Sequence, residues 1–165
     1  MHIPPSFVIH ETSHWLINHR LDSHLPGHLM LSAKQMTHSL VTLPIEALAE
    51  LGVLQAQIQQ AIETHLHPKR LYIGRFGHDA VHSIHFHFIP IYPWVEALFW
   101  QDERYRSLQT FGSLPDGSNQ TDGAELTLFV WREFCERPDP PSIEGPSIDQ
   151  AITVLQQAFS ADTSV

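Results

Sequence analysis

The sequence predicts an α+β fold: an antiparallel sheet of about five strands, one long helix between strands 3 and 4, and a C-terminal helical extension. Short apolar segments with a period of two residues lie on both sides of one long segment with a helical period. A second helical segment lies near the C-terminus, and no internal repeat or second core pattern interrupts the order. Residues 1–165 are therefore predicted to form a single domain.

The predicted strands are short and lie on both sides of the helix. Those that precede it are residues 7–10, 14–18 and 28–32. The turn-like residues 11–13 indicate that the first two strands form a hairpin. Leu71–Ile73 is the fourth strand, and a bend leads from it into the fifth, so residues 70–90 are predicted to be an antiparallel pair.

The long helix is predicted over Pro44–Glu63. Proline suits a first helical turn, and the apolar residues that follow recur on one side with a helical period. Gly52 lies inside this helix, where glycine costs about 1 kcal/mol relative to alanine. Close packing against a neighbouring element is the expected reason for a glycine at this position.

Residues 93–165 follow as an extension of this pattern. Residues 94–106 are predicted to form one or two short helices, residues 114–123 a loop, and residues 147–159 a final helix. Residues 125–131 are predicted to form a further strand, although apolar side chains dominate both of its faces.

Composition excludes several classes of protein. Hydrophobic residues make up 42% of the chain, which is too many for a disordered protein. A formal net charge of -9 argues against a basic groove for nucleic acid. No apolar run approaches the roughly 20 residues that cross a bilayer, and no secretory signal pattern is found, so no membrane partner is expected. The single cysteine, Cys135, excludes an internal disulfide and a Cys-based zinc site, and a cytoplasmic location is expected.

The most informative segment is Ser83–Phe88, in which polar and apolar residues alternate strictly. In a strand, Ser83, His85 and His87 share one face, and the apolar residues between them share the other. The two imidazoles then lie roughly 6–7 Å apart along the strand. That spacing suits two side chains that hold one phosphate, or two ligands of one metal ion.

These residues resemble the histidine triad family of nucleotide hydrolases and nucleotidyl transferases. The family signature has three histidines that alternate with apolar residues, and Ser83 occupies the first of those positions here. Upstream, the segment Pro26-Gly27-His28 is similar to the start of a strand in this family. The likeness covers residues 7–92 as the family-like core, and residues 93–165 are then a subgroup-specific extension.

The resemblance implies a covalent mechanism. His85, at the middle position, attacks the α-phosphorus of a purine nucleotide derivative, and water or another acceptor resolves the nucleotidyl-histidine. The attacking nitrogen must be neutral, and an acceptor such as a backbone carbonyl must hold the other ring nitrogen. His87 and Ser83 are the expected phosphate partners. No metal and no cofactor are required, and the usual assembly is a homodimer.

Three further residues are assigned to nucleotide binding. The resemblance places His28 near the site, although a structural hydrogen-bonding role is an equal alternative. Arg75 precedes the histidine strand, where it can meet a phosphate or simply face solvent. His78 lies on the same loop, and His82 is a second candidate to replace the missing histidine. Alternation directs His82 to the opposite face, so a local bulge would have to redirect it.

Some charged residues are interpreted as solvent-facing rather than functional. They are Arg20, Asp22, Glu96, Asp102 and Glu103.

Two other functions stay open. One is a non-catalytic nucleotide-binding regulator, because binding tolerates the loss of a catalytic contact at Ser83 better than turnover does. The other is a metal-dependent enzyme built on the His-x-His pair. This needs a third ligand, and no carboxylate or histidine follows before Glu96.

Overall fold

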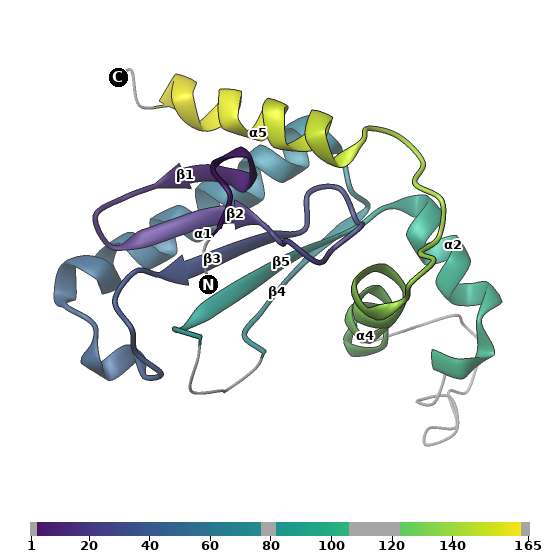
Figure 1. Cartoon of the computed structure of the whole chain (residues 1–165), viewed down its shortest axis with the longest axis horizontal. Helices are drawn as coiled ribbons and strands as arrows, with labels where there is room; N and C mark the ends of the chain where they lie inside the picture. Colours follow the sequence, from purple (N-terminus) through teal and green to yellow (C-terminus); the bar gives the residue numbers. More distant parts are fainter. Residues whose placement is uncertain (1–2, 77–81, 106–122, 163–165) are drawn as a thin grey trace.

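Five antiparallel strands form the sheet at the centre of the computed structural model, which describes residues 3–76, 82–105 and 123–162 (Figure 1). Their order is β1-β2-β3-β5-β4. The strands are β1 (Val8–Glu11), β2 (Trp15–His19), β3 (Leu29–Ala33), β4 (Arg70–Gly74) and β5 (His85–Ile91). The predicted α+β class and the antiparallel pairing of residues 70–90 are confirmed.

Helix α1 (Ile45–Leu66) connects β3 to β4 and lies across one face of the sheet (Figure 1). Leu54, Ile58 and Ile62 recur every four residues and are buried, as expected for a helix with one apolar side. The Trp15 indole N–H donates to the Ala47 carbonyl at 2.9 Å and ties the helix to the sheet. Gly52 is exposed, and a Cβ atom there would meet nothing within 4 Å, so the close-packing interpretation is wrong.

The register of β5 separates its apolar and polar side chains. Phe86 contacts Trp15 on the side that α1 covers, at a ring-centroid separation of 6.4 Å. His85 and His87 therefore face the other side of the sheet. The strand begins only at His85, so the predicted alternation does not extend back to Ser83.

A left-handed turn positions His28 at the start of β3. Gly27 has φ +77°, and a Cβ atom there would come within 2.4 Å of the Leu66 side chain. The Tyr92 hydroxyl donates to the Pro26 carbonyl at 2.9 Å from the end of β5. The turn is thus held between α1 and the strand that carries the two histidines.

The described residues of the extension form helices rather than a sixth strand. They are α2 (Pro93–Gln101), the 3-10 turn η3 (Glu103–Tyr105), α4 (Ala124–Val130), the π-helical turn η4 (Trp131–Glu136) and α5 (Ile148–Asp162). The predicted strand over residues 125–131 is wrong. Leu126, Phe129 and Val130 are buried at helical spacing, and packing overrides the strand propensity of this apolar run. Most of the predicted loop at 114–123 lies outside the described residues.

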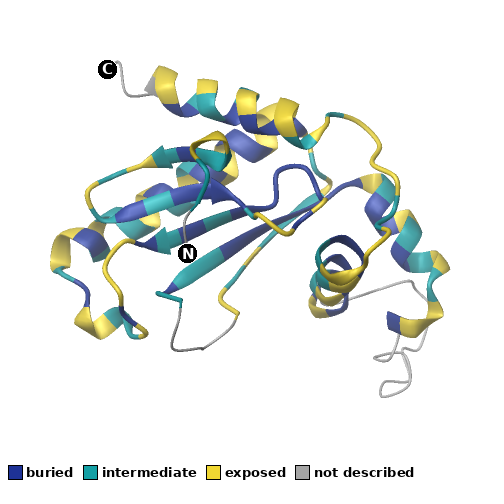
Figure 2. Ribbon diagram, in the orientation of Figure 1, coloured by how far each residue is buried: buried dark blue, intermediate teal, exposed yellow. Residues whose placement is uncertain are grey.

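The buried residues of the extension pack into the same cluster as those of the sheet (Figure 2). Helix α5 lies against β1 and α1 (Figure 1). Helices α2 and α4 lie near the start of β4 and the end of β5. Glu96 on α2 is buried rather than solvated, because Lys69 at 2.8 Å and Arg70 at 3.2 Å neutralise its carboxylate. Among the described residues, no helix is both long and apolar enough to cross a membrane.

Candidate active site

Three imidazole rings lie together on the sheet face opposite α1. His85 and His87 follow each other on β5, with ring centroids 5.2 Å apart at an angle of 70°. His28, from the segment that precedes β3, lies 5.7 Å from His87 by the same measure. His87 Nδ1 and His28 Nε2 are 3.4 Å apart. We call His85, His87 and His28 the ring row.

A backbone carbonyl fixes the tautomer of His85. Its Nδ1 lies 2.8 Å from the Ser83 carbonyl oxygen, which only accepts hydrogen bonds, so Nδ1 carries the proton. The lone pair is then on Nε2. His85 is half-buried. The structure therefore provides the carbonyl partner that a nucleophilic imidazole requires.

The surroundings of His28 and His87 favour the neutral form of both rings. Burial, reinforced by the positive charge of Arg20, lowers the pKa of His28 well below its ordinary value. The same causes, with His85 as a further one, lower the pKa of His87 to about 3. His28 Nδ1 lies 2.9 Å from the Ser23 hydroxyl. In a consistent assignment, Ser23 donates to His28 Nδ1, and His28 Nε2–H donates to His87 Nδ1. His87 Nε2–H then remains for a ligand.

Arg20 is part of this site, contrary to the expectation that it is solvated. Its side chain is only 13% exposed, and Asp22 accepts two hydrogen bonds from it at 2.5 and 2.9 Å. The guanidinium lies 5.0 Å from the centre of the Trp131 ring. Asp22 itself is exposed, as expected.

The extension supplies one side of the site through η4. Cys135 Sγ lies 4.0 Å from His28 Nδ1, and burial raises the pKa of this thiol. The His24 N–H donates to the Phe134 carbonyl at 2.8 Å, which joins η4 to the loop that precedes His28. We call Arg20, Trp131 and Cys135 the side wall. Sequence patterns did not reveal the side wall, because Cys135 and His28 are 107 positions apart.

Ser83 and Arg75 are not brought into the ring row. The Ser83 hydroxyl donates to the Gln35 carbonyl at 2.6 Å and accepts from the Thr37 N–H at 3.2 Å. An Arg75 guanidinium nitrogen donates to the His38 carbonyl at 2.7 Å. His78 lies outside the described residues. Their assigned roles stay predictions, as do those of His28, His85 and His87.

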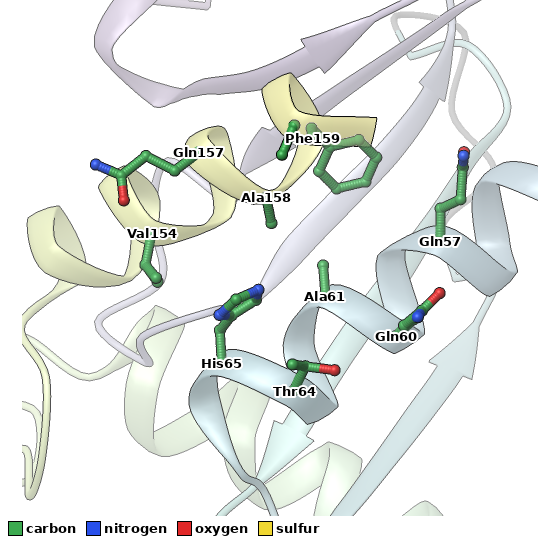
Figure 3. A pocket seen from close by; sticks show the side chains of 10 residues that line it. Gln57, Gln60, Ala61, Thr64, His65, Val154, Gln157, Ala158 and Phe159 are labelled. Atoms are coloured by element: carbon green, nitrogen blue, oxygen red, sulfur yellow. The ribbon is translucent and has the colours of Figure 1, made fainter. Parts of the chain in front are cut away.

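A separate pocket lies between α1 and α5, away from the ring row (Figure 3). Ala61, Ala158 and Phe159 form its apolar part, and Gln57, Gln60 and His65 are among its polar residues. It contains none of the predicted site residues. In the parts of the chain that the structure describes, no group of three or more His, Cys, Asp or Glu side chains is arranged to hold a metal ion.

Comparison with known proteins identifies the fold. No protein-family model and no curated protein sequence matches the chain. A zinc-bound histidine triad family protein from Mycobacterium smegmatis is 16% identical, with 98% of this chain and 88% of that chain covered and a TM-score of 0.55. A hypothetical histidine triad nucleotide-binding protein from Sulfolobus tokodaii strain 7 is 12% identical, with coverages of 94% and 84% and a TM-score of 0.54. The chain therefore has the fold of the histidine triad proteins.

Proposed function

We propose that this protein is a nucleotide hydrolase or nucleotidyl transferase that acts at the α-phosphorus of a purine nucleotide derivative. The observation that carries the proposal is the His85 ring, whose Nδ1 is bound by the Ser83 carbonyl at 2.8 Å and whose Nε2 holds the lone pair. The nucleotide-binding name of the Sulfolobus tokodaii structure supports the choice of ligand.

The proposed reaction has two displacements. His85 Nε2 attacks the α-phosphorus, the bond from phosphorus to the leaving group breaks, and a nucleotidyl-histidine forms. The Nδ1–H bond to the Ser83 carbonyl stabilises the positive charge that the ring acquires. Water or another acceptor then attacks phosphorus, and the electron pair of the P–N bond returns to His85.

His87 serves in this proposal as a neutral hydrogen-bond donor. Because its Nδ1 is bound to His28, its Nε2–H is directed to an oxygen of the phosphoryl group. In this proposal the Ser83 hydroxyl fixes the backbone next to His85, because it is bound to the Gln35 carbonyl. His28 orients the His87 ring. We place the nucleotide against the side wall, where Arg20 adds a positive charge next to the phosphates.

The substitution His85→Ala tests the proposal. We expect turnover of adenosine 5′-phosphoramidate to fall by more than about 10³-fold, because the nucleophile is lost. The adenylyl-enzyme should disappear from intact-protein mass spectra. The midpoint of thermal unfolding should not change, because a half-buried side chain such as His85 contributes little to packing. His65→Ala, on α1, is the matched control and should keep full activity. Wild-type rates in His85→Ala would contradict the assignment.

The same assay separates the two alternatives. The Ser83 hydroxyl is already bound to the Gln35 carbonyl, which favours a nucleotide-binding regulator. Such a regulator would bind AMP tightly without forming any adenylyl-enzyme. A metal-dependent enzyme would lose activity after exhaustive chelation, whereas the proposed mechanism would not.

We also propose a homodimer that forms through the free edge of the sheet. Strand β4 is the last strand in the sheet order, and Ile73 on it is 40% exposed. Sedimentation velocity measures the mass directly, and a charged residue at position 73 should weaken association.

A further inference from the structure

A fourth imidazole lies next to the proposed nucleophile. The His82 ring centroid is 6.2 Å from that of His85, and the two rings are T-shaped at 73°. His85 thus has one imidazole neighbour on β5 and a second on the segment that leads into the strand. An ideal strand would direct His82 and His85 to opposite faces, because they are three positions apart.

A bend explains why His82 lies on the side of His85. Regular strand geometry begins at His85, and the preceding residues are held by the segment that follows β3. Ile84 N–H donates to the Thr37 carbonyl at 2.8 Å, and the Ser83 hydroxyl donates to the Gln35 carbonyl at 2.6 Å. Ser83 is therefore a positioning residue for this bend, and its hydroxyl proton is not available to a phosphate.

Resting on the proposed function, we infer that His82 is the acid–base residue of this site. As His85 Nε2 bonds to phosphorus, His82 gives its proton to the leaving atom while the bond from phosphorus to that atom breaks. In the second step His82 takes a proton from the attacking water, the P–N bond breaks, and its electron pair returns to His85. Both histidines then have their starting protonation states.

The neighbours of His85 differ in their ability to transfer a proton. His87 is buried and its pKa is lowered to about 3, so its ring stays neutral and serves as a hydrogen-bond donor. His82 is half-buried, so solvent reaches its ring, and an imidazole ring can both donate and accept a hydrogen bond. A ring-centroid separation of 6.2 Å leaves His82 close enough to His85 to form a hydrogen bond to a group held between the two rings.

The experiment compares two probes that share the adenylyl group and differ in the leaving group. Adenosine 5′-phosphoramidate must have its leaving nitrogen protonated, whereas the p-nitrophenyl ester of AMP releases a stable phenolate. In His82→Ala we expect the first-turnover rate with the phosphoramidate to fall by about 10²–10⁴-fold. The first-turnover burst of p-nitrophenol should stay within about tenfold of wild type. His82→Gln keeps an N–H donor but transfers no proton, and it should behave like His82→Ala.

The outcomes distinguish this inference from the proposed function. If wild-type protein forms no adenylyl-enzyme with either probe, the proposed function and the inference fail together. If wild-type protein is active and His82→Ala loses rate equally with both probes, or with neither, only the inference fails. Rescue of the phosphoramidate rate by His82→Gln would also overturn proton transfer. His65→Ala should match wild type throughout, and thermal unfolding verifies that each variant is folded.

Discussion

Buried histidines make the stability of this protein depend on pH. In the folded state the pKa of His87 is lowered to about 3 and that of His28 is lowered well below its ordinary value, in both cases mainly by burial. In the unfolded chain these rings bind protons as the pH falls below about 6.5. Protons then favour the unfolded state, so stability is full above pH 6.5 and decreases toward pH 3.

The expected slope is about 1.4 kcal/mol per pH unit for each such ring below pH 6.5. Urea unfolding at pH 6.5, 5.5 and 5 measures it before carboxylates begin to contribute. His87→Asn removes one titrating ring and should reduce the slope by one such increment, whereas His65→Asn, on exposed helix surface, should not. An unchanged slope in His87→Asn would show that His87 is charged in the folded protein.

For individual residues, the sequence predicted those positions in the site that depend on local strand geometry. The pairing of His85 with His87 follows from strand alternation alone, and the structure places both rings on one face. The position of His82 could not be predicted, because it depends on bonds from residues 83–84 to residues 35–37. Cys135 reaches His28 only through tertiary packing, and no local pattern records that.

Helix α1 contains a glycine, Gly52, at a position where the surrounding structure leaves room for a side chain. Gly52 lies in the helix interior, is exposed, and leaves open space where a Cβ atom would be. Gly52→Ala should therefore raise the free energy of unfolding by about 0.5–1 kcal/mol, because alanine loses less backbone entropy in a helix. Thermal or urea unfolding measures this, and activity should not change. A destabilised variant would mean that a neighbour closes on this position.

The predicted and observed elements differ where packing outweighs propensity. The long helix and the sheet strands were found because their periodicity is regular. Residues 125–131 form α4 instead of a strand, since an apolar run of this length fits both kinds of element. Leu126, Phe129 and Val130 match the helical surface that faces α2 and β5, and that surface is invisible in the sequence.

For the whole molecule, the extension and the sheet should unfold together. Phe134 is fully buried, with its ring 5.7 Å from that of Trp94 and 6.2 Å from that of Phe129. Phe134→Ala should cost about 3–5 kcal/mol of stability, whereas Leu128→Ala, at a site that is 49% exposed, should cost far less. Circular dichroism and tryptophan fluorescence should give coincident transitions. A separate early transition would show that residues 93–165 unfold alone.

The two faces of the sheet separate the effects of substitutions on stability from their effects on the ring row. Substitutions among the side chains beneath α1, such as Phe88, alter how firmly the molecule holds together but leave the groups around the ring row in place. Substitutions in Arg20 or Trp131 alter what lies beside those rings without opening the interior under the helix. In the proposed enzyme, a change of substrate preference and a change of thermal stability can therefore come from different sets of residues.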